Sequence, residues 1–320
     1  MRKPSDYPAP SYQDPNDRRL VQIIRGAKRA EAGAVNILGV PFDGAVLGRK
    51  GAAEGPAAIR ESMGGFSNYS LELGVGLEGA RICDLGDLVV ENADVRKAHA
   101  QIEGEVIDDL RRDSLLVILG GDNSVSFPAL KAASKAFGRL GLIVIDSHLD
   151  IRGKIRGKPT SGSSYGLAIE GGLVDPKNVV EIGAHGFLNS EVYVKRAEKL
   201  GIGLISAEDL SRRGPKAVSR EASAAASRKT DAVYVSFDLD AVDLSQVSGV
   251  SAPSAGGMWA RDAFTLLYEI ARERKVKCAD IVELAPSLDP SGSSQRVAAA
   301  SLVHLVGGYR ARTKPGRPSH

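Results

Sequence analysis

Cysteine and long apolar runs are scarce in this chain of 320 residues, and each scarcity excludes a class of protein. The two cysteines, Cys83 and Cys278, each lie in an apolar run, which predicts buried, reduced thiols and not a disulfide-stapled secreted fold. No stretch is apolar enough to span a bilayer, and residues 1–22 lack the apolar core of a signal peptide. We therefore expect a cytoplasmic protein that does not contact membranes.

An excess of one charge is also missing. The 42 Lys and Arg residues nearly balance the 39 Asp and Glu residues, giving a net charge of +3, and no long basic run occurs. Nucleic-acid binders usually carry such a run or a basic face, so we expect no nucleic-acid partner. Hydrophobic residues make up 43% and charged residues 25%, which is typical of a globular chain with a large core.

Short apolar runs alternate with helical patterns along most of the chain. Residues 1–16, rich in Pro and Asp, are expected to form an extended arm, followed by a short amphipathic helix near 17–29 within a single α/β domain spanning 17–320. Strands are expected at 34–38, 82–85, 115–119, 142–146, 179–182, 203–206, 232–238 and 278–284. Helices are expected at 56–63, 95–112, 125–137, 191–200, 215–226 and 259–274.

The expected strands are apolar on both faces, as in a parallel sheet that helices cover on both sides. The alternation of strand and helix therefore predicts a three-layer α/β/α fold with a mainly parallel sheet. Segments 152–164 and 243–257 are rich in Gly, Ser, Lys or Pro, and we expect both to be loops over a site.

Three of these strands run directly into polar clusters. The strand at 115–119 precedes G-G-D-N-S (120–124), the strand at 142–146 leads into D-S-H-L-D (146–150), and the strand at 232–238 leads into D-L-D-A-V-D (238–243). Carboxyl ends of parallel strands share one edge of the sheet, so these acids should converge. Because clustered carboxylates repel one another in a low dielectric, we expect a cation among them.

Alternate residues of an extended segment point to the same side. Asp146, His148 and Asp150 can therefore present two carboxylates and an imidazole together, and Asp238 with Asp240 can do the same. This ligand set favours Mn²⁺, with Ni²⁺ or Co²⁺ as alternatives. A single D-x-H-x-D segment can equally be an Asx turn with a satisfied surface histidine, so the prediction depends on the three clusters together.

Those three clusters resemble the metal-binding signatures of the arginase, agmatinase and formimidoylglutamase (ureohydrolase) family. The resemblance extends to G-V-P-F-D-G (39–44), G-P-A-A-I-R (55–60), S-G-V-S-A-P (248–253) and E-L-A-P-S-L-D (283–289), and so covers residues 34–310 in order. It implies an arginase-like fold and two Mn²⁺ ions per subunit. Asp146 and Asp238 would bridge the ions, Asp150 would complete the first, and His148 with Asp240 would complete the second.

The resemblance also implies a reaction, the hydrolysis of a C–N bond in a linear amidine that releases urea, or ammonia or formamide. Glu283 would hold the cationic N–C–N group of the substrate, although a structural glutamate that caps a helix is the alternative. Asp150, Glu283 and His185 are the candidate catalytic residues. His185 follows an expected strand and could shuttle protons.

Two positions depart from the family pattern. Asn123 stands where the family usually has a histidine ligand; an amide oxygen can still bind a hard cation, with lower affinity. Ser161 and Ser163, candidate substrate-binding residues, stand where arginases and agmatinases have a His-Gly step, and there the chain is more similar to formimidoylglutamases. Lys154, Arg156 and Lys158 could meet an acidic substrate tail, although such charges are usually only solvated.

We therefore predict a binuclear metal-dependent hydrolase of guanidino or formimino compounds. A formimidoylglutamase-like or small guanidino substrate is favoured over agmatine, and arginine comes last. Asn123 leaves open an alternative, a catalytically silent subunit with a structural or regulatory role beside an active paralogue. The resemblance implies a homotrimer or homohexamer.

Overall fold

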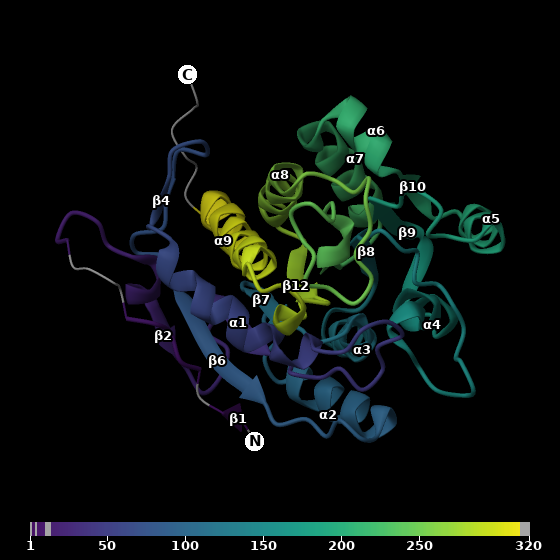
Figure 1. Ribbon diagram of the computed structural model, residues 1–320, viewed down its shortest axis with the longest axis horizontal. Helices are drawn as coiled ribbons and strands as arrows, with labels where there is room; N and C mark the ends of the chain where they lie inside the picture. The colour runs from purple at the N-terminus through teal and green to yellow at the C-terminus, as the bar shows by residue number, and fades with distance from the viewer. Residues whose placement is uncertain (1, 4, 10–13, 314–320) are drawn as a thin grey trace.

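A ten-stranded sheet forms the centre of the protein in the computed structural model, which describes residues 2–3, 5–9 and 14–313 (Figure 1). Its strands are β1 (Arg2–Lys3), β2 (Ile24–Gly26), β3 (Val35–Gly39), β6 (Ile82–Leu88), β7 (Leu115–Leu119), β8 (Leu140–Ile145), β9 (Val174–Ile182), β10 (Gly203–Ile205), β11 (Ala232–Asp238) and β12 (Val276–Val282). The order is β1-β6-β3-β7-β12-β11-β8-β9-β10, and β2 also pairs with β6. Only the β1–β6 pair is antiparallel among the described strands of this sheet.

Helices cover both faces of the sheet. They are α1 (Gly55–Ser62), α2 (Val95–Ile107), α3 (Ser126–Phe137), α4 (Ser164–Glu170), α5 (Glu191–Leu200), α6 (Ala207–Arg213), α7 (Pro215–Ser227), α8 (Ala260–Ala271) and α9 (Ser293–Thr313). One apolar cluster joins α1, α7, α8 and α9 to one face, and a second joins α2, α3, α4 and α5 to the other. In β7, Leu115, Val117 and Leu119 enter the first cluster, whereas Leu116 and Ile118 enter the second. The predicted three-layer α/β/α fold is therefore confirmed.

All eight expected strands and all six expected helices of the main domain are present, with ends shifted by a few residues. The helix expected near 17–29 is wrong, because this segment forms a short 3-10 turn at Leu20–Gln22 followed by β2. Pairing with β6 satisfies the backbone there. The sequence analysis also missed α4, α6, α9 and the small antiparallel pair β4 (Tyr69–Ser70) and β5 (Val75–Gly76).

The long helix α9 contains Gly307 and Gly308, which argue against a helix in the sequence alone. The structure gives the reason for Gly308: a Cβ there would collide with the carbonyl oxygen of Tyr268 on α8. Glycine thus lets the two helices approach closely, and they lie side by side in Figure 1. Tertiary packing has overridden local propensity at this point.

The N-terminal segment is held on its own chain where it is described. β1 pairs with the end of β6, and the hydroxyl of Tyr7 donates to Asp84, which also forms a buried ion pair with Arg60. Residues 1, 4 and 10–13 of the expected arm lie outside the described part of the chain. Among the described residues, no helix has both the length and the apolar character needed to cross a membrane.

Candidate metal centre

The predicted metal ligands and Glu283 come from the ends of four strands that are direct neighbours, β7, β12, β11 and β8. All four are parallel, so their carboxyl ends meet at one edge of the sheet. Asn123 follows β7, Glu283 follows β12, Asp238 ends β11, and Asp146 comes directly after β8. The sheet therefore brings together residues that lie as much as 160 positions apart in the chain.

The same local turn ends three of these strands. The carboxylate of Asp146 accepts the backbone N–H of His148 at 2.6 Å, Asp238 accepts that of Asp240 at 2.9 Å, and Asp122 accepts that of Ser124 at 2.9 Å. These are Asx turns, in which a side chain bonds to the backbone two residues on. The turn that the sequence analysis weighed against a metal site is thus present, and at two of the three strands it is followed by a side chain of the site, His148 after Asp146 and Asp240 after Asp238.

Asp146, His148 and Asp240 form the tightest cluster. One ligand atom of each lies within 4.8 Å of the others. His148 Nδ1 is 3.0 Å from Asp240 Oδ2 and 3.6 Å from Asp146 Oδ1, so the imidazole faces both carboxylates. Both aspartates are buried, and His148 is only partly exposed. Three side chains of the predicted ligand set are therefore in reach of a single cation.

The electrostatics of this site are those of crowded, buried acids. Burial raises the pKa of Asp146 well above its usual range, and the charges of Asp240 and Asp150 raise it further. Asp238 is shifted the same way, by burial and then by Asp240 and Asp146. Burial alone would lower the pKa of His148, but its hydrogen bonds to Asp146 and Asp240 and their charges raise it to about 12. Among the described residues, the protonated imidazole of His148 is the only cation between Asp146 and Asp240.

The donor atoms that are present fit a divalent cation. Asp146 Oδ2 and Glu283 Oε2 are buried and have no hydrogen-bond partner. A buried carboxylate oxygen without a partner is costly in free energy, and a bound cation would remove that cost for Asp146. Carboxylate oxygens with one imidazole form the ligand set expected for Mn²⁺ and related ions.

Asn123 does not present its amide oxygen to the acids. Its Oδ1 accepts hydrogen bonds from Tyr165 and Ser126, both at 3.0 Å, while its Nδ2 donates to Asp150 Oδ2 at 2.6 Å. The structure thus departs from the expectation of an oxygen ligand, because two hydroxyl donors already occupy that oxygen. Asn123 instead orients Asp150, whose pKa burial raises to about 6.

Glu283 lies at the same edge, on the turn that follows β12. Its Oε1 accepts the backbone N–H of Asn123 at 2.7 Å, while Oε2 remains without a partner. Burial and then the charge of Asp122 raise its pKa to about 8. Asp150 and Glu283 both have positive φ, 45° and 69°, which is uncommon for residues with a Cβ.

The remaining predicted residues have other contacts. Ser161 Oγ accepts the N–H of Leu47 at 3.2 Å, and Ser163 Oγ bonds both backbone groups of Thr160. His185 Nδ1 lies 2.8 Å from the carbonyl of Gly183, and its Nε2 lies 2.8 Å from Ser254 Oγ. Both nitrogens are thus engaged, and His185 lines a pocket with Met258 and Trp259 in which none of the predicted metal ligands takes part.

Two residues beside the site were missed. Arg152 follows Asp150 by two residues, its guanidinium lies 5.0 Å above the ring of Tyr193, and its charge lowers the pKa of Asp150. Its spacing from Asp150 gave no usable signal, because Asp150 has a positive φ and the segment is not an extended strand there. Asn189 hydrogen-bonds the backbone on both sides of His148, and nothing in the sequence pattern marks it.

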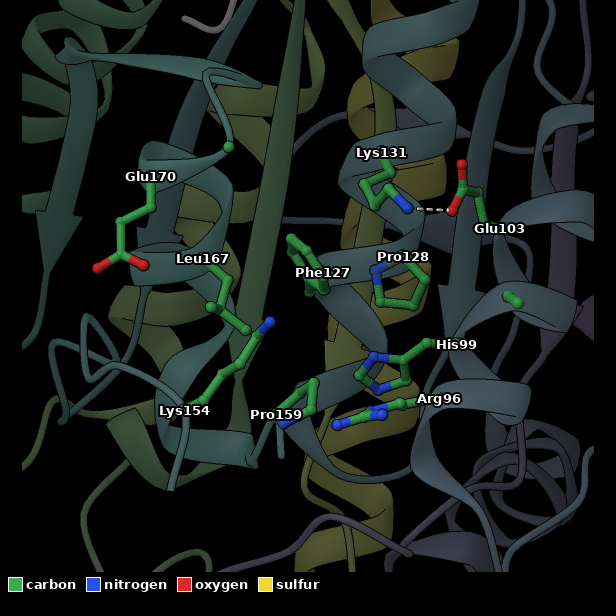
Figure 2. Close-up of a pocket in the computed structure, with 12 residues that line it drawn as sticks. Arg96, His99, Glu103, Phe127, Pro128, Lys131, Lys154, Pro159, Leu167 and Glu170 are labelled. Atoms are coloured by element: carbon green, nitrogen blue, oxygen red, sulfur yellow. Dashed lines mark hydrogen bonds and ion pairs between the residues drawn. The ribbon is translucent and has the colours of Figure 1, made fainter. Parts of the chain in front are cut away.

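A separate cavity of about 600 Å³ lies between α2, α3, α4 and the loop at 154–159. Figure 2 shows Lys154 pointing into it, opposite His99 and Arg96. None of the predicted metal ligands lines it. Lys154, which the sequence analysis considered for an acidic substrate tail, therefore faces this cavity, whereas the charges of His148 and then Arg152 act on Asp150.

Comparisons with known proteins agree with this geometry. The family model described as the arginase family matches residues 33–307. A formimidoylglutamase from Halalkalibacterium halodurans is 32% identical over 274 residues, which cover 85% of this chain and 86% of the relative. The crystal structure of formimidoylglutamase from Bacillus subtilis superposes with a TM-score of 0.88 at 27% identity and covers 94% of both chains.

A further solved structure is that of Trypanosoma cruzi formiminoglutamase with Mn²⁺. It superposes with a TM-score of 0.83 at 29% identity and covers 92% of this chain and 99% of the other. The family match spans most of the sequence, including every predicted site residue. This chain therefore belongs to the arginase family of enzymes that hydrolyse carbon–nitrogen bonds.

Proposed function

We propose that this enzyme hydrolyses a formimino or guanidino compound with an acidic tail, as a formimidoylglutamase does, using two divalent ions, Mn²⁺ first and Ni²⁺ or Co²⁺ as alternatives. The observation that carries the proposal is the buried cluster of Asp146, His148 and Asp240, in which Asp146 Oδ2 has no hydrogen-bond partner. The relatives described above act on formiminoglutamate by their names.

In this proposal Asp146, His148, Asp150, Asp238 and Asp240 would hold the two ions. When bound, such a pair of ions would lower the pKa of a water molecule and would supply positive charge that stabilises the transition state. Asn123 contributes indirectly by donating to Asp150. Asp150 is the partly exposed carboxylate of the set and would accept the proton of the attacking water.

Glu283 is assigned to the amidinium of the substrate. One of its oxygens is held by the backbone of Asn123, and the other is buried, unpartnered and free to accept an N–H of the substrate. A charged amidinium would favour the ionised carboxylate and so lower the pKa of Glu283 from its raised value near 8. The substrate would therefore supply the cation that this glutamate lacks.

Arg152 is assigned to the acidic tail. Stacking on Tyr193 limits the positions its side chain can adopt, and its charge lowers the pKa of Asp150, after the larger effect of His148. A fixed guanidinium matches a carboxylate in two-point fashion. This cation at the site favours an acidic tail over the cationic tail of agmatine.

In this proposal Asp150 carries out the proton transfer. His185 has no direct part in that transfer, because Gly183 and Ser254 engage both ring nitrogens of His185. Ser161 and Ser163 then act by holding the loop over the site through Leu47 and Thr160. We also propose that the chain forms a single domain, that the protein is cytoplasmic and that it assembles as a homotrimer or homohexamer.

The direct test is a turnover assay on purified protein supplied with Mn²⁺ or Ni²⁺. The panel contains N-formimidoylglutamate, acidic guanidino compounds, agmatine and arginine, and the released ammonia or urea is measured. We expect turnover of an acidic member and at least about tenfold lower kcat/KM for agmatine, as loss of a charge-assisted contact implies. Absence of turnover on the whole panel with both ions contradicts the proposal.

The alternative of a catalytically silent subunit is favoured by one observation, the engaged amide oxygen of Asn123, which leaves the first ion with fewer ligands. Metal analysis separates the two cases. Two ions per chain after dialysis support the enzyme, whereas one or none, together with absent turnover, supports the silent subunit.

A further inference from the structure

The segment that carries His148 leaves the regular sheet just before the histidine. The last backbone bond between β8 and its neighbour β9 runs from the N–H of Asp146 to the carbonyl of Ile182, at 3.0 Å. β9 ends there, and its chain turns away at Gly183, where φ is 114°. Residues 147–150 are therefore without ladder bonds to β9 at the point where the ligand side chains begin.

Asn189 supplies the missing support from the loop between β9 and α5. Its Oδ1 accepts the N–H of Leu149 at 3.0 Å, and its Nδ2 donates to the carbonyl of Ser147 at 2.8 Å. The two backbone groups flank His148 on either side. Because one can only donate and the other can only accept, they also fix which way the carboxamide faces.

We propose that Asn189 is the positioning residue for the metal ligand His148. The proposal rests on the proposed function only in requiring that His148 binds a metal ion. The other side-chain bonds to residues 147–149 in the described chain come from Asp146 and Asp240 and, within the segment itself, from Ser147 Oγ, which lies 3.0 Å from His148 Nδ1. The two acids are proposed ligands themselves and must adjust to an ion, and Ser147 moves with the segment, so Asn189 is the support from outside both the ligand set and the segment.

The effect expected from this arrangement is on metal affinity. Partners that orient a ligand typically change affinity by about 10- to 100-fold when removed, because the ligand must then be ordered at the moment of binding. We expect Asn189→Ala to weaken Mn²⁺ binding by about that factor. Asn189→Ser, which keeps a hydroxyl, should fall between Ala and the unaltered chain.

A charge variant separates geometry from electrostatics. Asn189→Asp keeps an acceptor for Leu149, but it sets an oxygen against the carbonyl of Ser147 and adds a negative charge beside the cations. If charge alone mattered, Asp would tighten binding of a divalent ion. If positioning matters, Asp weakens it, because the carboxylate cannot bridge an N–H and a C=O.

A matched control lies on the same strand. Asn178 on β9 also clamps two backbone carbonyls, those of Ala225 at 2.9 Å and Arg228 at 2.8 Å, but it lies in the middle of the strand and its partners are on and just after α7, where none of the proposed ligands lies. Asn178→Ala therefore removes two comparable bonds without touching a ligand. It reports the general cost in stability of losing such a clamp.

The experiment measures Mn²⁺ dissociation constants by calorimetry and Mn²⁺ signals by electron paramagnetic resonance, with melting temperatures in excess chelator. The expected result is weakened binding in Asn189→Ala and Asn189→Asp, with binding in Asn178→Ala within about twofold of the unaltered chain. Unchanged binding in Asn189→Ala, equal weakening in Asn178→Ala, or tighter binding in Asn189→Asp overturns the inference. An unaltered chain that binds no divalent ion overturns this inference and the proposed function together, whereas normal binding without turnover overturns only the latter.

Discussion

The acidic side chains at the carboxyl edge of the sheet lower the stability of the folded protein. Asp146, Asp238 and Asp240 are buried together at this edge, and only His148 offsets their charge in the described part of the site. Burial and mutual repulsion both favour the neutral acids, as the raised pKa values of Asp146 and Asp238 show. A site of this kind gains its stability only when a cation enters.

This cost leads to a prediction for Asp146. We expect Asp146→Asn to lower turnover by at least about 10³-fold, because a carboxylate oxygen of the proposed metal site and its charge are lost. In excess chelator the variant should melt at the same temperature as the unaltered chain or higher, since a buried charge has been removed from the cluster. Metal content, turnover and melting temperature check this together. A variant that retains two ions and normal activity contradicts it.

The role of Arg152 gives a second prediction at the same scale. We expect Arg152→Ala to raise KM for an acidic substrate by about 10- to 100-fold, the loss of a charged hydrogen bond of about 1.5 to 3 kcal/mol. For a neutral guanidino compound of similar length, KM should change by less than about threefold. Lys154→Ala is the matched control, because Lys154 faces the separate cavity. Equal losses on both substrates would show that Arg152 has a structural role only.

The elements of the fold were largely predictable because strands and helices left strong patterns. Strands such as β7 and β8 are buried on both faces, so a continuous apolar run marked each one. The failures have physical reasons. Glycines that serve close packing hid α9, and the segment at 17–29 joined the sheet through β6 instead of forming a helix.

The site was predictable to the extent that its residues directly follow strands. Asp146, His148, Asp150, Asp238 and Asp240 could be named because the topology of a parallel sheet places such residues together. The contacts of Asn123 with Tyr165, and of Asn189 with the backbone near His148, join positions about 40 residues apart through loops. Loop conformation follows no periodicity, so these partners could not be read from the sequence.

The contact of α7 with β8 gives a prediction at the scale of elements. A Cβ on Gly141 would lie well inside contact distance of the carbonyl oxygen of Ala226, which is backbone and cannot swing away. We expect Gly141→Ala to lower the free energy of unfolding by about 1 to 3 kcal/mol, as overpacking in a core does. Gly104→Ala on α2 is the control, because its Cβ would meet open space. Urea titration measures both, and equal stability of the two variants contradicts the prediction.

At the scale of the whole molecule, the carboxyl groups with raised pKa values make the stability of the protein depend on pH and on bound metal. The pKa of Glu283 is raised by burial from an ordinary 4.5 to about 8, and that of Asp150 from 3.8 to about 6. A group with a raised folded pKa contributes its full stability below its unfolded pKa and loses it as pH rises through the folded value. The metal-free protein should therefore become less stable from about pH 4 to pH 8.

The measurement is a series of urea unfolding curves between pH 5 and pH 8, in chelator and in excess Mn²⁺. With chelator, the midpoint should fall as pH rises. With Mn²⁺, the fall should shrink or reverse, because an ion that binds only the folded state stabilises it more as the acids ionise. A metal-free protein that gains stability toward pH 8 would show that the carboxyl pKa values are not raised.

Two residues of the site, Asp150 and Glu283, hold a backbone conformation that glycine would adopt more easily. A laboratory population of this enzyme that is selected for heat resistance alone should thus drift toward glycine at both positions and lose its chemistry. Selection that also demands turnover should keep both acids and seek its heat resistance in other parts of the chain. Heat resistance and catalysis therefore compete at these two positions, and sequencing the selected variants would show which of them prevailed.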